Sequence, residues 1–268
     1  MISEINNLPF NLEKLRETLG LLLQAEKPHV YWTFIFEKLA TTVDKKAAEN
    51  EFQYPELVRR LINLNIESFL KTLENLDAGT EISEAWKISV KAAKRKNISF
   101  FQHLAIDTSA EVNFSLIKNL TLGFSEDELK LLENDFEKIS SFVNNLVSQT
   151  TKWVEEIWAS GVEEKISSFP YLPGPVYIPR LVKEGWFSAM DSALLNYRRK
   201  TAIHEARKIQ KLTETEQENA FLLLDRQTAK INRQVISPPV PFALGITFIH
   251  SLEPATASEI LNAFPESE

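Results

Sequence analysis

The spacing of the prolines is the feature that most constrains the fold of this chain. No proline occurs between Pro55 and Pro170, and none occurs between Pro179 and Pro238. Proline disrupts a helix interior because it lacks a backbone N–H and clashes with the preceding turn. Within both stretches, apolar residues recur at helical spacing. The sequence therefore predicts an all-α protein that forms a single bundle of about eight helices.

Capping signals place the individual helices. Ser125 followed by Glu128, and Thr213 followed by Glu216, are capping boxes, a pattern typical of helix starts. Pro55 suits a first helical turn, where its missing N–H costs nothing. We expect helices over residues 9–25, 55–78, 83–94, 98–120, 125–160, 180–211, 213–234 and 255–263, and a further helix that starts near residue 28 and includes residues 31–39.

Two segments cannot form helices. Residues 169–179 contain four prolines, and the segment 238–249 begins with three prolines in four residues. Both segments are rich in aromatic and branched apolar residues, which soluble monomers do not expose as large patches. We expect an ordered loop over 169–179 and a C-terminal tail that packs back over the helices. Residues 1–268 are expected to form one domain, with a helical core over 9–236 and an extended tail over 237–268.

The composition argues against several classes of protein. The net charge of −7 disfavours a nucleic-acid partner, which requires a basic surface. The absence of cysteine excludes disulfides and thiolate catalysis. No apolar run approaches the roughly 20 residues of a membrane span, and the N-terminus lacks the pattern of a signal peptide. We therefore expect a cytoplasmic protein with no membrane span.

The helix expected over residues 98–120 carries polar side chains on two faces. At about 100° per residue, these side chains form two stripes along the helix. The first stripe contains His103, Asp107, Glu111 and Lys118, and the second contains Gln102, Ser109 and Asn113. The first stripe is either a solvated face or part of a site. The second lies among apolar residues, where polar groups either bond to one another or line a pocket.

The first stripe has a spacing that suits a metal. His103, Asp107 and Glu111 are four residues apart, so they can converge on one ion. One helix supplies too few ligands, and His204 is the candidate ligand from another helix. Without cysteine, such a site favours Mg, Mn or Fe. Lys118 on the same stripe favours a solvated face instead. Among the other histidines, His29 follows a proline at a helix start and is expected to be exposed.

A resemblance to a known family is centred on the same helix. The family pattern Gln-His-Leu-Leu-Leu-Gly-Met-Asn-Ala-His-Ile-Asn-x-Asp-Leu is matched in register by Gln102, His103, Leu104, Ala110, Asn113 and Leu116. The pair Ala85-Trp86 and the order of elements from Trp32 to Trp153 also agree. The chain thus resembles an uncharacterised bacterial domain-of-unknown-function family (family five-nine-nine-five).

The departures from the family pattern matter for chemistry. Where the family has Asn, His and Asp, this chain has Ser109, Glu111 and Ser115. If the family residues serve a metal or a proton transfer, that activity is altered or lost here, although Glu111 can still act as a ligand or base. The family has no established reaction, so the resemblance supports the location of a site more than its chemistry.

Three functions remain open. The first is an enzyme without a cofactor that acts on a small, largely apolar molecule, in a polar-lined pocket beside helix 98–120. In this hypothesis the catalytic residues are His103, Glu111 and Asn113, and the residues contacting substrate are Gln102, Ser109 and His204. The second is a non-catalytic ligand-binding or assembly protein, including a homo-oligomer. The third is a hydrolase dependent on a divalent metal held by His103, Asp107, Glu111 and His204.

Overall fold

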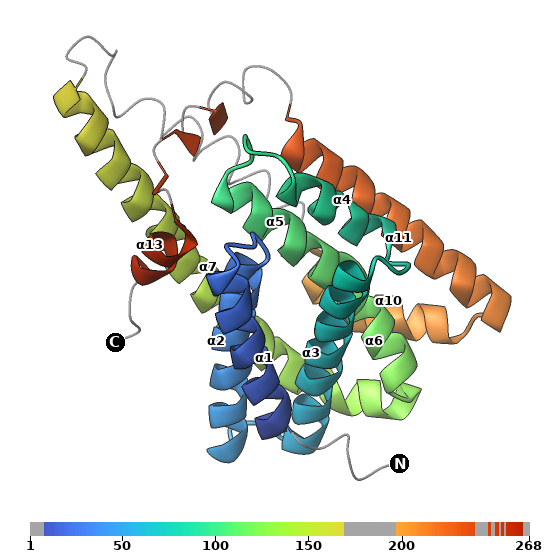
Figure 1. Cartoon of the computed structure of the whole chain (residues 1–268). Coiled ribbons are helices and arrows are strands. Elements are labelled where there is room, and N and C mark those ends of the chain that lie inside the picture. The colour runs from blue at the N-terminus through green and yellow to red at the C-terminus, as the bar shows by residue number, and fades with distance from the viewer. Residues whose placement is uncertain are drawn as a thin grey trace.

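The computed structural model describes residues 8–168, 197–238, 246–247, 250–251, 253–254 and 256–264. All regular structure in these ranges is helical, which confirms the prediction of an all-α protein (Figure 1). The proline-rich loop expected over 169–179 lies outside the described residues, as does most of the helix expected over 180–211. The elements are α1 (Leu8–Gln24), α2 (Val30–Ala48), α3 (Pro55–Ala78), α4 (Glu84–Ala93), α5 (Phe100–Ala110), the π-helix η1 (Glu111–Ser115), α6 (Leu116–Gly123), α7 (Glu126–Ser168), α10 (Tyr197–Gln210), α11 (Glu214–Ile236) and α13 (Ala257–Asn262).

Local capping explains most of the boundaries. Ser125 and Glu128 exchange side-chain and backbone hydrogen bonds before α7, and Thr213 and Glu216 form the same capping box before α11. Helix α3 begins with Pro55 at its first turn. It ends at Gly79, whose φ of 66° is a left-handed conformation that glycine adopts without steric cost.

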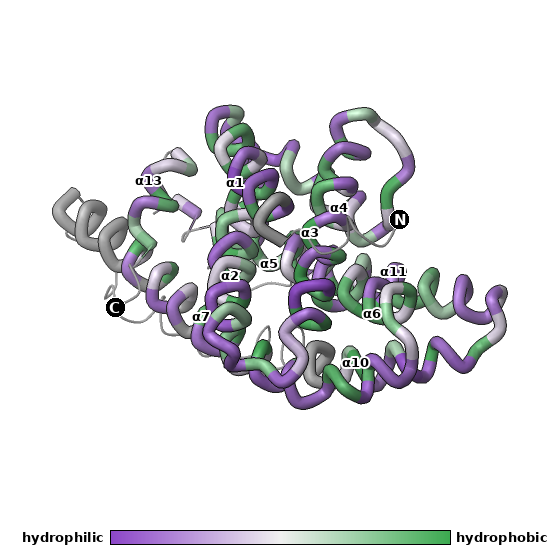
Figure 2. The backbone as a smooth tube through the Cα atoms, turned by 90° about the horizontal axis from the view of Figure 1, so that it is seen from below, coloured by the Kyte–Doolittle hydropathy of each residue, from purple (hydrophilic) through white to green (hydrophobic). Residues whose placement is uncertain are grey.

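The centre of the bundle is the continuous helical run α5–η1–α6. Helices α2 and α4 pack against α5, and α11 lies alongside both α4 and α5 (Figure 1). Helix α10 packs against α6 and η1, while α1 and α3 pack on α2 and on each other. The central run is therefore surrounded by helices. The tube view in Figure 2 shows hydrophobic and hydrophilic residues alternating along the outer helices, as expected where only one face is buried.

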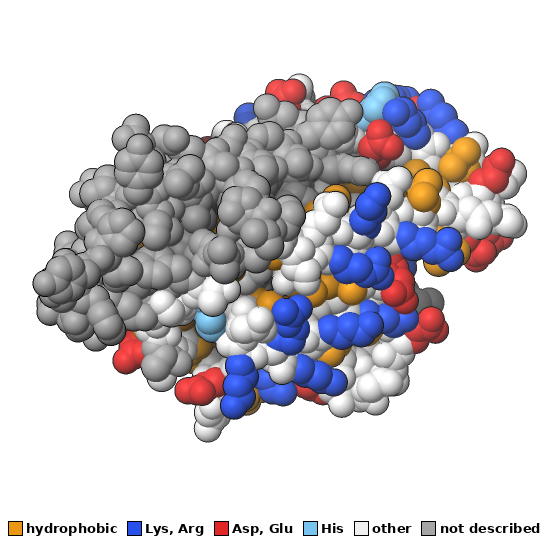
Figure 3. Space-filling model, turned by 90° about the horizontal axis from the view of Figure 1, so that it is seen from above, with side chains coloured by type: hydrophobic (Ala, Val, Ile, Leu, Met, Phe, Trp, Pro, Cys, Tyr) orange, Lys and Arg blue, Asp and Glu red, His pale blue; other side chains and the backbone are white. Residues whose placement is uncertain are grey.

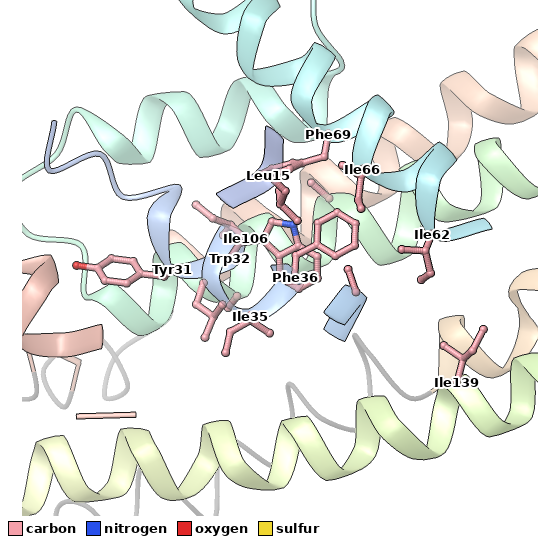
Figure 4. Close-up of a cluster of buried hydrophobic side chains, with 14 of the residues drawn as sticks. Leu15, Tyr31, Trp32, Ile35, Phe36, Ile62, Ile66, Phe69, Ile106 and Ile139 are labelled. Carbon is pink, nitrogen blue, oxygen red and sulfur yellow. The ribbon is translucent and has the colours of Figure 1, made fainter. Parts of the chain in front are cut away.

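Aromatic side chains link α2, α3 and α4 in the core. The Trp32 ring stacks on Phe36 with centroids 5.4 Å apart. Phe69 then contacts Phe36 at 5.9 Å and Trp86 at 5.7 Å. Figure 4 shows Trp32, Phe36 and Phe69 converging with Leu15, Ile66 and Ile106. Each buried side chain of this size contributes roughly 1.5–3 kcal/mol, so this cluster holds the helices around α5 in place.

A carboxylate from α11 completes the start of α4. The Asp225 oxygens accept hydrogen bonds from the backbone N–H groups of Glu84 at 2.7 Å and Ala85 at 2.8 Å. These first N–H groups of a helix have no partner within the helix, and a negative charge there also favours the helix dipole. The contact fixes α4 against α11.

The described residues of the C-terminal range 253–264 pack on the bundle, whereas most of the apolar segment 238–249, which was expected to do so, lies outside the described residues. The Trp153 indole N–H donates to the Ile260 carbonyl oxygen at 2.7 Å. The Phe264 ring contacts Phe34 and Trp153 with centroids 5.1 and 5.2 Å apart. Glu253 accepts a 3.1 Å hydrogen bond from the backbone N–H of Phe100, at the first turn of α5. The tail therefore anchors both α7 and the start of the central helix.

No helix in the described ranges is long and apolar enough to cross a membrane.

Candidate functional site

The central helix contains one π-helical turn, between α5 and α6. Within η1 the backbone N–H of Leu116 donates to the Glu111 carbonyl oxygen, five residues earlier instead of four. Such a turn inserts one extra residue into a helix and occurs frequently at functional sites. It widens the helix at the position where the sequence places Glu111 and Asn113.

Both polar stripes of this helix are buried. The buried set contains Gln102, His103, Asp107, Ser109, Glu111, Asn113 and Ser115. The solvated-face interpretation of the first stripe is therefore wrong for all its members except Lys118, which is exposed. The reason is the central position of the helix, because α2 and α4 pack on α5 while α10 and α11 pack on η1.

The second stripe forms hydrogen bonds within the fold. The Gln102 side-chain oxygen accepts from the backbone N–H of Ser99 in a capping box, and its amide group donates to the Val235 carbonyl oxygen at 2.7 Å. The Asn113 amide donates to the Ser109 hydroxyl at 3.0 Å. The Asn113 side-chain oxygen is buried and has no hydrogen-bond partner among the described residues. Gln102 is thus a structural tether, while Asn113 retains an unused acceptor.

The first stripe is connected to two other helices through Asp107. His29, the residue before α2, and Asp107 are joined by a hydrogen bond of 2.9 Å between Nδ1 and Oδ2. The Ser89 hydroxyl of α4 donates to the other oxygen of Asp107. We call this trio of buried side chains, His29, Ser89 and Asp107, the hub. The expectation that His29 is exposed is wrong, since only 8% of its surface remains accessible.

One helical turn from each hub residue lies a buried polar side chain whose polar atoms lack a hydrogen-bond partner of good geometry. Trp32 follows His29 by one turn on α2, Trp86 precedes Ser89 by one turn on α4, and Glu111 follows Asp107 by one turn. The indole N–H groups of Trp32 and Trp86 and both carboxyl oxygens of Glu111 have no hydrogen-bond partner of good geometry. Buried groups of this kind are rare in native proteins and require an explanation, such as a ligand.

Burial shifts the proton equilibria of this stripe. Burial raises the pKa of Glu111 to about 8, although the Ser115 hydroxyl acts to lower it. Burial also lowers the pKa of His103 to about 4, while the Asp107 charge acts to raise it. For His29, burial alone would lower the pKa, but the Asp107 carboxylate outweighs it and the net pKa is raised. At neutral pH the stripe therefore contains a largely protonated carboxyl group at Glu111 and a neutral imidazole at His103.

The predicted metal ligands are not assembled. His204 lies on α10 with its side chain exposed, whereas His103, Asp107 and Glu111 are buried in the central helix. Within the part of the chain that the structure describes, no three His, Asp or Glu side chains are grouped closely enough to hold a metal ion. The side chain of His204 is exposed, whereas Gln102 and Ser109, with which it was predicted to bind substrate, are buried.

Family comparison agrees with the sequence pattern of this helix. The model of a family described as "Family of unknown function (DUF5995)" matches residues 11–238. The chain belongs to this family. No curated protein and no solved structure gave a match. The DUF5995 match includes every element from α2 to α11, so the hub and η1 both lie within the family domain.

Sequence reasoning located the central helix of this DUF5995 protein but missed the residues that face it. Ser89 and His29 lie 18 and 78 residues from Asp107 in sequence, so no local pattern connects them. One signal was available, because the motif Ala85-Trp86 places Trp86 on the same helix face as Ser89, three residues later.

Proposed function

We propose that this protein is an enzyme that acts on a small, largely apolar molecule beside η1, with Glu111 as its proton donor. The observation that carries the proposal is the state of Glu111. Its carboxyl group is buried in a π-helical turn, and neither oxygen is engaged in a good hydrogen bond. A carboxyl with a pKa of about 8 remains largely protonated at neutral pH, as a general acid requires. Functional sites are where such perturbed groups concentrate.

Two further residues of the central helix support this assignment. His103 is buried, and its pKa of about 4 keeps the imidazole neutral at pH 7. Asn113 offers its unpaired amide oxygen from the same π-helical turn as Glu111. In the proposed site, Asn113 orients the substrate and His103 provides a proton acceptor. The proposal gives Gln102 and Ser109 a supporting role, because both already have partners in the fold.

The proposal is tested by measuring turnover of a panel of apolar esters, amides, ketones and epoxides. We expect Glu111→Gln to reduce the rate on any active substrate by about 10²–10⁴-fold, the usual contribution of a general acid. The far-ultraviolet circular dichroism should remain that of the wild type, and Glu137→Gln, at an exposed glutamate of α7, should have wild-type activity. Equal turnover by Glu111→Gln and wild type would overturn the proposal.

A non-catalytic ligand-binding protein is the second candidate. It is favoured by the hydrogen bonds that already engage Gln102, Ser109 and Asp107 within the fold. In that case native mass spectrometry of the purified protein should detect a bound small molecule, and incubation should leave its mass unchanged. Glu111→Gln would then change the fraction of protein that carries the bound molecule, and neither the variant nor the wild type would turn over any substrate.

A further inference from the structure

A histidine and a carboxylate from the C-terminal residues meet at the start of the central helix. The Nδ1 atom of His250 lies 2.9 Å from a carboxyl oxygen of Glu253, and its Nε2 atom lies 2.9 Å from the Lys96 carbonyl oxygen. The same Glu253 oxygen accepts the hydrogen bond from the backbone N–H of Phe100, at the first turn of α5. The pair therefore joins the C-terminal residues to the loop before α5 and to α5 itself.

These contacts fix the number of protons that the pair holds. A carbonyl oxygen only accepts hydrogen bonds, so Nε2 of His250 carries the proton that it donates to Lys96. The Nδ1 contact then requires a second proton, located either on Nδ1 or on the Glu253 carboxyl. A neutral imidazole beside an ionised carboxylate has one proton too few, so it keeps only one of the two histidine contacts.

We infer that His250 and Glu253 form a pH-operated latch, in which the shared proton holds the C-terminal residues on the first turn of α5 and its loss releases them. The inference rests on the proposed function, because it concerns the regulation of the same site. His103 lies three residues after Phe100, and its backbone N–H donates to the Ser99 carbonyl oxygen at 3.1 Å within the same first turn.

The two partners of the latch differ in their access to solvent. Side-chain exposure is 34% for His250 but only 4% for Glu253. Figure 3 shows histidine side chains, in pale blue, at the surface of the molecule. A proton can thus leave the imidazole directly to solvent, while the carboxylate that remains is buried and has lost its cationic partner. Such an arrangement is unfavourable, so the deprotonated pair separates.

The proton equilibria of the pair agree with its contacts. The hydrogen bond with Glu253 is the largest influence on His250 and raises its pKa, while burial acts to lower it. Burial raises the pKa of Glu253, although the hydrogen bonds from His250 and Phe100 act to lower it. Because the folded pKa of His250 lies above the ordinary 6.5, the latch is fully closed below pH 6.5 and opens as pH rises through the folded pKa.

Other titratable groups face the latch from α2 and α5. Burial raises the pKa of Tyr31 on α2, and the Glu253 charge acts in the same direction, so this phenol stays neutral. Burial is the largest cause of the low pKa of His103 on α5, and the charge of His250 also acts to lower it. The side chain of Lys96 is exposed, and Trp158 of α7, which acts to lower the pKa of Glu253, does not titrate. His250 is therefore the group of the latch that titrates above pH 6.5.

Opening of the latch is local. The Ile260 carbonyl oxygen remains bonded to Trp153 of α7, and the Phe264 ring remains packed on Phe34 of α2. Neither contact involves a group that titrates. We therefore expect release around His250 and Glu253, with a loosened first turn of α5, while the end of the chain stays attached.

The test measures the protection of the Phe100 amide from hydrogen exchange by NMR in the full-length protein. Corrected for the intrinsic exchange rate, protection should fall by about tenfold or more between about pH 6 and about pH 9, since each unit of pKa shift corresponds to a factor of ten. The ring of His250 should titrate above pH 6.5, with the same midpoint as the loss of protection.

Substitutions identify the proton. His250→Gln keeps an amide donor for Lys96 but does not titrate, so protection of Phe100 should no longer depend on pH. Glu253→Gln still accepts from Phe100 but carries no charge, so the pKa of His250 should fall toward 6.5. The pKa of His103 should rise in His250→Gln, because a nearby positive charge is removed. The matched control His204→Gln, at an exposed histidine of α10, should behave as the wild type in all three measurements.

The outcomes separate the latch from the proposed function. Protection of Phe100 that does not depend on pH in the wild type overturns the latch, as does an equal pH dependence in His250→Gln. A His250 pKa at or below 6.5 also overturns it. None of these results bears on Glu111, and unchanged turnover in Glu111→Gln overturns the proposed function whatever the latch does.

Discussion

At the scale of single residues, burial is the largest cause of the pKa shifts of Glu111 and His103. His103, Asp107 and Glu111 form a stripe that could be read directly from their four-residue spacing. The burial of these side chains could not be read from the spacing, because Lys118 of the same stripe is exposed while the other three are buried. The difference arises from helices distant in sequence that cover only the first part of the stripe. Side-chain spacing is a local property, whereas desolvation depends on the whole fold.

A first prediction concerns Glu111 and pH. Its folded pKa of about 8 lies above the ordinary 4.5, so the folded state binds this proton more tightly than the unfolded state. The wild type should therefore lose stability relative to Glu111→Gln as pH rises from about 5 to about 8, by at most a few kcal/mol at roughly 1.4 kcal/mol per pKa unit. Urea unfolding at pH 5.5 and 8.5 measures this, with Glu137→Gln as control. A stability difference that is the same at both pH values would contradict the pKa shift.

A second prediction concerns the hub. Asp107→Ala leaves His29 buried without its partner, which should cost about 3–5 kcal/mol in the free energy of unfolding. Asp127→Ala removes an exposed aspartate paired with Lys130 and should cost less than about 1 kcal/mol. Because the pKa of His29 is raised, its pairing stabilises the fold fully below pH 6.5 and loses this effect as pH rises through the folded pKa. Similar urea midpoints for the two variants would count against the hub as a structural centre.

At the scale of elements, the capped helix starts followed from sequence, but the π-helical turn did not, and α7 continues to Ser168, beyond the end expected at residue 160. The capping residues Ser125 and Thr213 act on backbone groups only three residues away, so their effect is visible in sequence. The extra residue in η1 has no such local signal. It allows α5 and α6 to keep their own buried faces within one continuous helix.

A third prediction follows from this geometry. Deleting Val112, a half-buried residue of η1, should convert the π-helical turn to an ordinary α-helical turn and leave the faces of α5 and α6 in place. Deleting the exposed Lys118 instead rotates the rest of α6 by about 100° and turns its buried side outward. We expect circular dichroism melting to show a far smaller loss for the Val112 deletion than for the Lys118 deletion. Equal losses would mean that η1 does not compensate for an inserted residue.

At the scale of the whole molecule, the C-terminal residues contact helices from the middle of the chain. The sequence predicted that the segment 238–249 packs on the helices because it is too apolar to remain in water, but it could not indicate which helices receive the residues that follow it. The structure places Ile260 and Phe264 against Trp153, and Glu253 at the start of α5. These receiving positions depend on surfaces assembled from distant segments.

A fourth prediction tests the tail. Truncation after Ser237 removes the partner of the Trp153 indole and the aromatic contacts of Phe264. Each large apolar side chain lost contributes roughly 1.5–3 kcal/mol, so the truncated protein should melt at a lower temperature or aggregate. Differential scanning calorimetry with light scattering measures both effects. The point variant Phe264→Ala should produce a smaller shift in the same direction, and an unchanged melting temperature after truncation would contradict the role of the tail.

The two carboxylates that complete the starts of α4 and α5 also set an order of events during synthesis. Asp225 lies 141 residues after Glu84, and Glu253 lies 153 residues after Phe100. A ribosome adds about 5–20 residues per second, so both helices emerge many seconds before their caps. During that interval the emerging chain carries the central helix with its first turn unfinished. The starts of α4 and α5 are therefore completed only after Asp225 and Glu253 have been synthesised and have reached back to the middle of the chain.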